Sequence, residues 1–322
     1  MKRFDRRLSA AVLGTAVLAA VACGAASAAG RGEAHGPLGE ALDRYLSRLE
    51  SFGFSGSALV AQRGRVVLDK GYGLADREHH RPYTADTIFD IASISKQFTA
   101  AAILKLEMEG RLKVEDPLAK FLGPVPEDKQ PITLHMLLTH TSGLPDVLGD
   151  DEYEEVTRAE MVRRALAAKL IAVPGRKFRY SNAGYSLLAA VVEIASGEPF
   201  EKYLKERLWA PAGMLHTGFH VPDAERAARG YKPDGDWGTS FDHPWAPDGP
   251  WWDLRGNGGI LSTTGDLYRW HLALAGDKIL SANERKKYIT PFVSQGRAAH
   301  ASYGYGWSIE EDPKGGRLIS HI

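Results

Sequence analysis

Ser93 and Lys96 are the two residues of this sequence best spaced to do chemistry together. They begin an apolar run, residues 93–109, that has almost no polar face and is followed by Gly110, which predicts a buried helix. Residues three apart share a helix face, so the hydroxyl and the amine can touch. A lysine whose pKa is lowered by burial can take the proton of a serine nucleophile. The N–H groups of the first helical turn can stabilise negative charge on a reacting carbonyl oxygen.

The same residues also have a purely structural interpretation. Ser93 would cap the helix, and Lys96 would extend its amine out of the core. A Ser-x-x-Lys tetrapeptide is common by chance, so other residues must decide between the two interpretations.

Tyr180 and Asn182 form a second candidate pair. They lie between Pro174-Gly175, which stops a helix, and an apolar run, so the sequence predicts a loop around them. A tyrosine hydroxyl can shuttle protons, and an asparagine amide can hold a carbonyl group. Asn182 could equally cap the next helix.

The elements that must position these residues are both helices and strands. Helical periodicity predicts helices from Pro37 and over 161–170 and 185–195. Alternating patterns predict a hairpin, 57–62 with 66–70, and late strands at 303–310 and 317–321. Residues 211–250 are rich in Gly, Pro and Asp and are expected to be irregular. The pattern is typical of an α/β (α+β) fold with strands near both ends and helices between.

Four motifs, in order, resemble the serine β-lactamase and penicillin-binding-protein superfamily, and within it the class C β-lactamase-like branch. The resemblance covers nearly everything from Leu38 to His321. The motifs are Ser93-Ile94-Ser95-Lys96, Leu137-Leu138-Thr139-His140-Thr141-Ser142-Gly143-Leu144-Pro145, Tyr180-Ser181-Asn182 and Gly256-Asn257-Gly258-Gly259-Ile260-Leu261-Ser262-Thr263-Thr264-Gly265-Asp266-Leu267.

This resemblance implies an antiparallel β-sheet flanked by helices, with a largely helical inserted lobe. It implies that Ser93 is acylated, that Lys96 is the adjacent base and that Tyr180 is the proton shuttle. Asn182 would hold the substrate's amide and help to order the lysine. The third motif of the family, Lys-Thr-Gly or His-x-Gly on a strand, would begin at His321, which would then contribute to substrate binding.

Domain boundaries follow from the resemblance and the composition. We expect a signal peptide over 1–28, a tether over 29–36 and a catalytic domain over 37–322. The α/β lobe would comprise 37–100 and 255–322, and the helical lobe 101–254. Because the sequence stops at Ile322, the glycine of the third motif, the second oxyanion donor and the C-terminal strands are expected to be missing.

The N-terminus predicts export. Four basic residues in 1–7 precede an apolar run over 8–22 and then Ala26-Ser27-Ala28, a pattern typical of a secretory signal cut near Ala28. The apolar run is too short for a spanning helix. The only cysteine, Cys23, lies in this signal, so the mature chain would form no disulfide. Alternatively, residues 20–23 resemble a lipoprotein cleavage box, with a lipid anchor at Cys23. The protein is thus expected to be secreted or periplasmic, or anchored through Cys23.

Several other functions are disfavoured. The net charge is zero, which argues against binding of nucleic acid or of a membrane surface by bulk charge. The sequence has no Gly-x-Ser-x-Gly, His-Glu-x-x-His or phosphate-loop motif. The pair His79-His80 lacks further ligands at useful spacings, as do His135 and His140, so we expect no metal or organic cofactor.

Two further motifs have structural interpretations. His140 is more consistent with a turn beside the site than with a catalytic base. Thr263 to Asp266 resembles a capping box before a helix over 267–274, and 256–259 forms a tight loop that could line the cleft.

These observations predict an exported serine hydrolase that forms an acyl-enzyme on an ester, a D-amino-acid amide or a β-lactam. Its partner would be a small-molecule or peptide substrate. The alternative is a non-hydrolytic relative that binds penicillin or a cell-wall peptide as a receptor.

Overall fold

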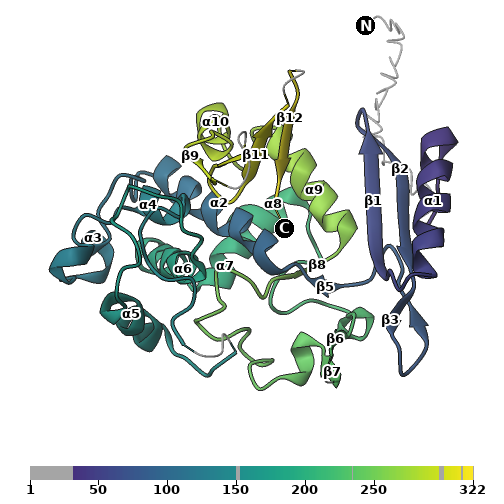
Figure 1. Cartoon of the computed structure of the whole chain (residues 1–322), viewed down its shortest axis with the longest axis horizontal. Helices are drawn as coiled ribbons and strands as arrows, with labels where there is room; N and C mark the ends of the chain where they lie inside the picture. Colours follow the sequence, from purple (N-terminus) through teal and green to yellow (C-terminus); the bar gives the residue numbers. More distant parts are fainter. Residues whose placement is uncertain (1–31, 150–152, 234, 297–300, 313–314, 322) are drawn as a thin grey trace, which may run out of the picture.

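A computed structural model of the chain describes residues 32–321 apart from 150–152, 234, 297–300 and 313–314 (Figure 1). The predicted signal peptide and the possible anchor at Cys23 lie outside the described residues. Within them, no helix is both long enough and apolar enough to span a bilayer.

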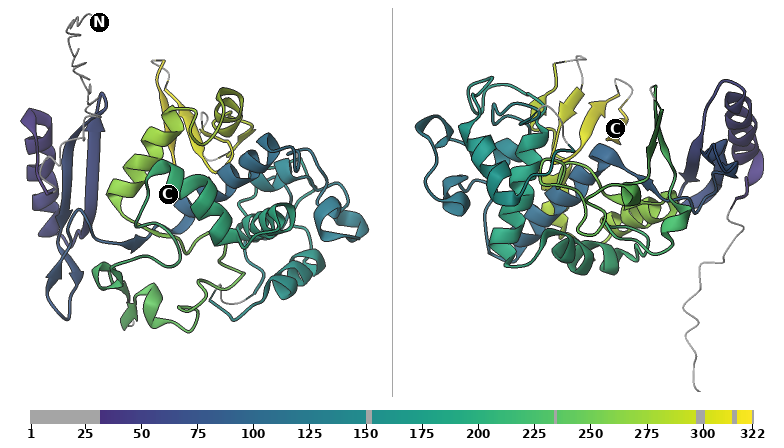
Figure 2. Two further views of the ribbon diagram at one scale, coloured as in Figure 1. Left: turned by 180° about the vertical axis from the view of Figure 1, so that it is seen from behind. Right: turned by 90° about the horizontal axis from the view of Figure 1, so that it is seen from below.

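The N-terminal part is a helix on a hairpin. Helix α1 (Gly36–Glu50) has Pro37 in its first turn, where a missing N–H is harmless, and packs on β2 (Arg65–Tyr72) of the β1 (Gly56–Gln62)–β2 hairpin. A Cβ added to Gly39 would lie 2.1 Å from the Val67 oxygen, so the two elements approach at backbone distance. The predicted helix and hairpin are confirmed, and Figure 2 shows them together at one side of the molecule.

Helix α2 (Ser95–Met108) forms the centre of the core, as the apolar run predicts. It packs against α6 (Asn182–Ser196), and the ring of Phe98 contacts Trp209 and Trp270 at centroid distances of 5.8 and 4.8 Å. A short 3₁₀ turn, η1 (Ala92–Ile94), precedes it. Ser93 therefore lies in a tight turn before the α-helix.

Most of the remaining helices are short, and they come between β5 and β9 in the sequence. Their bounds are α3 Ala119–Leu122, η2 Glu127–Lys129, α4 Leu134–Leu138, α5 Arg158–Ala167, α7 Phe200–Leu204, the π-type turn η3 Lys205–Trp209, α8 Ala210–Ala212, η4 Ala224–Arg226, η5 Ser240–Asp242, α9 Thr264–Ala275 and α10 Ala282–Tyr288. Thr263 caps α9 by accepting the Asp266 N–H at 3.1 Å, as its motif predicts.

The late strands form a four-stranded antiparallel sheet in the order β12 (Arg317–Ser320), β11 (Ser308–Glu311), β10 (Ala301–Tyr303) and β9 (Val293–Ser294). The prediction of one strand over 303–310 is wrong, because the chain turns between β10 and β11. Gly306, at φ +79°, makes this turn possible, and a Cβ there would lie 2.9 Å from the Lys96 oxygen. The turn thereby lies directly on the start of α2.

The expectation that 211–250 is irregular is also wrong in part. It contains a hairpin of β6 (Gly230–Lys232) and β7 (Gly235–Gly238), which the turn-rich composition concealed. Two further short pairs are β3 (Leu74–Asp76) with β4 (Arg81–Pro82) and β5 (Phe89–Asp90) with β8 (Leu261–Ser262).

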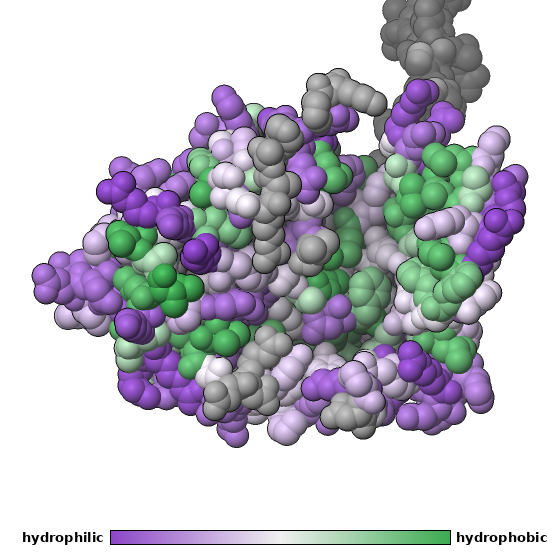
Figure 3. All heavy atoms as spheres, in the orientation of Figure 1, coloured by the Kyte–Doolittle hydropathy of each residue, from purple (hydrophilic) through white to green (hydrophobic). Residues whose placement is uncertain are grey.

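The predicted fold class, helices mixed with antiparallel strands, is confirmed. The described strands form separate sheets: β1–β2 and β9–β12 are not hydrogen-bonded to each other. Figure 3 shows apolar side chains gathered over the β1–β2 hairpin. There Leu59 and Ala61 line a shallow pocket together with Leu267 of α9.

Candidate active site

Ser93 is presented by a strained turn. Ala92 has φ +45°, a value unusual for a residue other than glycine, and its N–H is held by Asp90 Oδ1 at 2.7 Å. The β5–β8 pair and a bond from Ile91 N–H to Ile260 O (2.9 Å) fix the segment on its other side. The turn leaves Ser93 partly exposed, although the helix that follows is buried.

Lys96 is fully buried and points at Ser93. Its Nζ donates to Ser93 Oγ at 3.0 Å and to the Asn257 carbonyl oxygen at 2.9 Å. The amine also lies 4.9 Å from the ring centroid of Tyr180. The structural interpretation of the motif required Lys96 to extend its amine out of the core. Its burial contradicts that interpretation.

Tyr180 also contacts Ser93. Its hydroxyl donates to Ser93 Oγ at 2.9 Å. Burial raises the pKa of Tyr180 to about 12, the bond to Ser93 lowers it and the charge of Asp146 raises it. The phenol therefore keeps its proton at neutral pH and is a donor.

Asn182 is the first residue of α6 and does not lie in a loop, contrary to the sequence prediction. It does not cap the helix either, because Ser181 is the N-cap and accepts the Gly184 N–H at 3.0 Å. The Asn182 N–H donates to Asp146 Oδ1 at 3.0 Å. Its Oδ1 is buried without a hydrogen-bond partner among the described residues, so it can accept an N–H from a ligand. That Asn182 orders Lys96 stays a prediction.

His140 supports the segment that carries Tyr180. Its carbonyl oxygen accepts the Arg179 N–H (2.7 Å), and its Nδ1 accepts the Ser181 N–H (3.0 Å). Its ring lies against that of Tyr180, with centroids 4.3 Å apart. Because Nδ1 accepts, Nε2 carries the proton and donates to Tyr303 at 3.2 Å. These contacts agree with the structural role predicted for this histidine.

His321 follows β12 and faces the same region. Its Nδ1 donates to the Gly306 oxygen at 2.7 Å, which leaves Nε2 as an acceptor. Burial lowers the pKa of His321 to about 4, the bond to Gly306 opposes this shift and the charge of Lys96 adds to it. The imidazole is thus neutral at neutral pH.

Asn257 belongs to the site, although sequence reasoning assigned its loop no chemistry. Its side-chain Nδ2 donates to Ser186 Oγ (2.9 Å) and to the Asp253 oxygen (2.7 Å), and these bonds hold its carbonyl toward Lys96. Gly256 has φ +91°, and a Cβ there would lie 2.6 Å from Ala189 Cβ. The Gly-Asn-Gly-Gly sequence was the available signal, since such a run indicates close backbone approach.

Ser93 opens onto a cavity of about 310 Å³. Its lining residues are Asp90, Ala92, Ser93, Tyr153, Asn182, Gly230, Tyr231, Lys232, Trp237, Leu254, Asn257, Gly258 and Gly259. A larger hollow of about 520 Å³ lies beside His135 and Lys286, and none of the Ser93 group lines it. The smaller cavity is therefore the candidate substrate site.

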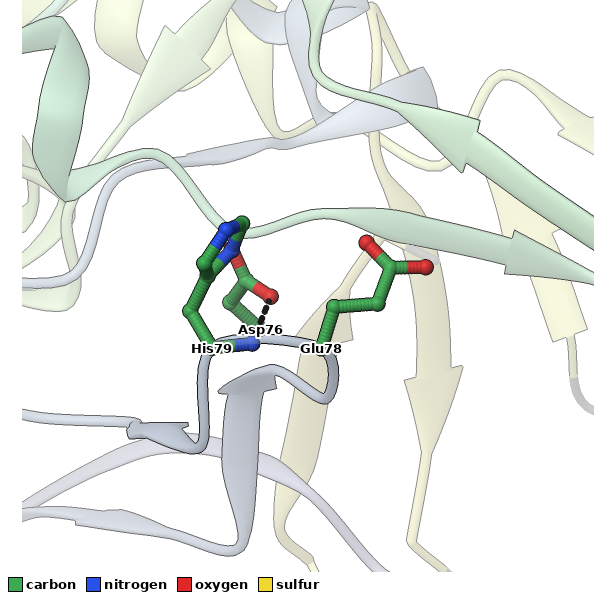
Figure 4. Close-up of side chains that lie close together, drawn as sticks. All are labelled: Asp76, Glu78 and His79. Atoms are coloured by element: carbon green, nitrogen blue, oxygen red, sulfur yellow. Dashed lines mark hydrogen bonds and ion pairs between the residues drawn. The ribbon is translucent and has the colours of Figure 1, made fainter.

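Asp76, Glu78 and His79 form the one group of three possible metal ligands among the described residues (Figure 4). Asp76 already accepts bonds from the N–H and the Nδ1 of His79, at 3.0 and 2.9 Å. Glu78 lies 3.7 Å from Arg229. These contacts account for all three side chains, so we assign no metal to them.

Known proteins share this sequence and fold. The β-lactamase family model matches residues 50–322. PbpX of Bacillus subtilis (strain 168), a candidate penicillin-binding protein by its name, is 34% identical over 263 residues, or 81% of this chain and 63% of PbpX. The D-alanyl-D-alanine-carboxypeptidase/endopeptidase AmpH of Escherichia coli (strain K12) is 33% identical over 244 residues, or 71% of this chain and 60% of AmpH. The chain spans about three fifths of the length of these curated relatives.

A solved structure gives the same result for the fold. The octameric penicillin-binding protein homologue from Pyrococcus abyssi has a TM-score of 0.76 and 29% identity to this chain. The match covers 89% of this chain and 68% of that one.

Proposed function

The chain belongs to the β-lactamase family, and from this premise we propose that it is a serine hydrolase that forms an acyl-enzyme. The observation that supports this most is at Ser93, whose Oγ accepts hydrogen bonds from both Lys96 Nζ (3.0 Å) and Tyr180 (2.9 Å). A serine used only as a helix cap has no need of a buried amine and a phenol on one oxygen.

In the proposed reaction, Ser93 Oγ attacks the carbonyl carbon of the substrate, and its proton passes to neutral Lys96. Tyr180 donates its proton to the leaving oxygen or nitrogen as the bond from that atom to the carbonyl carbon breaks, and the proton held by Lys96 replaces it. Water then attacks the carbonyl carbon of the Ser93 ester, and its proton passes through the same groups to Ser93 Oγ as the bond from that oxygen to the carbonyl carbon breaks. This releases a carboxylic acid and restores the free serine. The raised pKa of Tyr180 supports a relay through the neutral phenol, with the lysine as the base.

Asn182 and His321 are proposed to bind the substrate. The unpaired Oδ1 of Asn182 would accept an amide N–H, and Nε2 of His321 would accept a hydrogen bond at the end of β12. The Ser93 N–H, in the middle of the 3₁₀ turn that leads into α2, would face the oxyanion.

The substrate class is proposed as an ester, a D-amino-acid amide or a β-lactam. AmpH, at 33% identity, is named for D-alanyl-D-alanine carboxypeptidase and endopeptidase activity, and this supports a peptide substrate with D-residues. We assign the chain to the class C-like branch because tyrosine occupies the shuttle position. We also propose the two lobes, 37–100 with 255–322 and 101–254, as the catalytic architecture.

Export, through the signal over 1–28, is part of this proposal. The basic residues, the apolar run and Ala26-Ser27-Ala28 support it. Mass spectrometry of the mature N-terminus distinguishes cleavage near Ala28 from a lipidated Cys23.

Labelling with a fluorophosphonate tests the nucleophile. Intact-mass spectrometry should show one adduct in the wild type and none in Ser93→Ala. Ser95→Ala, a matched change two residues away at a fully buried serine, should still form the adduct. An adduct that persists in Ser93→Ala contradicts the assignment. A stable acyl adduct without turnover on a panel of esters, D-amino-acid amides and β-lactams indicates the receptor alternative.

A further inference from the structure

One wall of the Ser93 cavity is aromatic, and the proposed proton relay does not use it. Tyr231 and Trp237 come from the β6–β7 hairpin (Figure 1), and Tyr153 lies just before α5. All three side chains are partly exposed and line the cavity. Partly exposed rings that converge on a nucleophile offer a flat apolar surface to a ligand.

The rings of this wall are held rigidly from behind. Tyr153 stacks on Trp245 at 5.4 Å and 15°, and Trp245, which is buried, stacks on His243 at 4.2 Å and 7°. Trp237 packs against His243 at 4.2 Å. Because each ring has a neighbour, the wall loses little side-chain entropy when a ligand binds.

Tyr231 and the rim of the wall are also fixed. The Arg77 guanidinium lies 4.4 Å from the Tyr231 ring centroid, and the Arg77 N–H donates to the Tyr231 hydroxyl at 2.7 Å. The ammonium of Lys232 lies 5.6 Å from the Tyr153 ring centroid. The rim is therefore polar around an apolar centre.

The rest of the cavity lining leaves space for a ligand. It includes Asn182 and the loop with Gly258 and Gly259, and the two glycines contribute no side chain to the cavity. A volume of about 310 Å³ is at the lower end for a small-molecule site and suits one ring with a short linker.

In the proposed reaction, this cavity would receive the acyl part of the substrate. In the proposed reaction, Tyr180 protonates the leaving group, yet Tyr180 is not among the residues that line this cavity. The leaving group would therefore lie on the Tyr180 side, and the group on the other side of the carbonyl would lie against the wall.

We propose that Tyr153, Tyr231 and Trp237 make the protein selective for substrates whose acyl part carries an aromatic ring, a preference that rests on the proposed hydrolase function. A ring would stack on the wall, while an amide N–H beside it would reach the unpaired Oδ1 of Asn182. Stacking of this kind raises binding affinity by up to about tenfold.

The test compares p-nitrophenyl phenylacetate with p-nitrophenyl acetate, which share one leaving group. Acylation is measured on the full chain as the release of p-nitrophenol, which does not require turnover, and each rate is divided by that of the ester with hydroxide. The wild type should prefer phenylacetate about tenfold or more. Trp237→Ala and Tyr153→Ala should each lower this ratio several-fold, whereas Trp237→Phe should retain most of it. Tyr268→Ala on α9, away from the cavity, is the matched control and should leave the ratio unchanged.

The outcomes distinguish a failure of the proposed hydrolase function from a failure of the proposed selectivity for aromatic acyl groups. If neither ester acylates the wild type and no fluorophosphonate adduct forms at Ser93, the proposed function fails. If p-nitrophenyl acetate acylates Ser93 but the wild type shows no preference for p-nitrophenyl phenylacetate, only the inference about the aromatic wall fails. A preference that is the same in Trp237→Ala and Tyr153→Ala as in the wild type also overturns it, because the preference then arises elsewhere.

Discussion

Lys96 is completely buried next to the serine, and it is the base of the proposed reaction. Its neighbours on the two sides come from distant segments, Tyr180 and the carbonyl of Asn257. Only an amine can serve as a base here, since it can lose a proton at moderate pH and a guanidinium cannot. The identity of the side chain, and not its charge, should therefore decide activity.

Lys96→Arg tests this point. We expect acylation of Ser93 to fall by about a hundredfold or more, the usual contribution of a general base, although the positive charge is kept. The measurement is the rate of p-nitrophenol release, with circular dichroism and thermal unfolding to verify that the variant folds. A rate within about tenfold of the wild type would show that another group takes the proton.

His140 controls Tyr180 through the backbone and through its ring. It has φ +56°, which asparagine tolerates better than most residues. We predict that His140→Asn, which keeps an acceptor for the Ser181 N–H, retains more acylation activity than His140→Phe, which keeps only the ring. The loss in His140→Phe should be about tenfold or more, because a displaced catalytic group lowers the rate steeply.

The measurement for this pair is kcat and KM for one ester. A positioning role lowers kcat and leaves KM nearly unchanged. Equal stability loss and equal activity loss in both variants would mean that His140 acts only through packing.

At the scale of elements, the loop over 256–259 packs against both α6 and α2, the helix that follows Ser93. Its carbonyl at Asn257 holds Lys96, the Gly256 oxygen accepts Thr99 Oγ1 at 2.6 Å, and a Cβ on Gly256 would meet the backbone of Tyr185 at 2.8 Å. The loop can lie this close to α6 only without a side chain at 256. The absence of a side chain at Gly256 thus allows the next residue to place its carbonyl on Lys96.

Gly256→Ala should move this loop and destabilise the protein by about 1–3 kcal/mol, from the clash and from φ +91°. Acylation should fall as well, since the partner of Lys96 moves. Urea unfolding measures the first effect and p-nitrophenol release the second. Gly276→Ala is the control, because its φ is ordinary and an added Cβ would meet nothing nearer than 4.0 Å. A Gly256→Ala variant as stable as this control would contradict the close approach.

At the scale of the whole molecule, burial of histidines couples the site to stability in acid. Burial lowers the pKa of His140 well below 6.5 and that of His321 to about 4. In the unfolded chain both would titrate near 6.5. Between about pH 6.5 and 4 the unfolded state therefore binds more protons, and the free energy of unfolding falls as the pH falls. Asp253 acts in the opposite direction, because burial raises its pKa.

We predict a loss of about 1–3 kcal/mol between pH 7 and 4.5 from these histidines. Urea unfolding at several pH values measures it. His321→Gln should flatten the curve in this range, whereas the same change at exposed His271 should not. A stability that stays constant from pH 7 to 4.5 in the wild type would exclude the predicted linkage.

The sequence by itself determined the parts of this protein that depend on local periodicity. The contact between Ser93 and Lys96 followed from the helical repeat, because three residues bring two side chains to one face within a single turn. The buried helix α2, the helix-on-hairpin start and the cap at Thr263 also depend on neighbours within a few residues. The roles of Tyr180, Asn182 and His321 were predicted only from the resemblance to the family, which depends on the order of the motifs.

Tertiary structure alone decided what lies across the site. Tyr180 meets Ser93 across 87 positions of sequence, and Asn257 meets Lys96 across 161. No periodicity encodes such distances, because they depend on which faces of α2, α6 and the late loops pack together. The same is true of the turn at Gly306, which divided a predicted strand, and of the β6–β7 hairpin, which carries two rings of the aromatic wall. Packing of distant segments, and not local propensity, built the second half of the site.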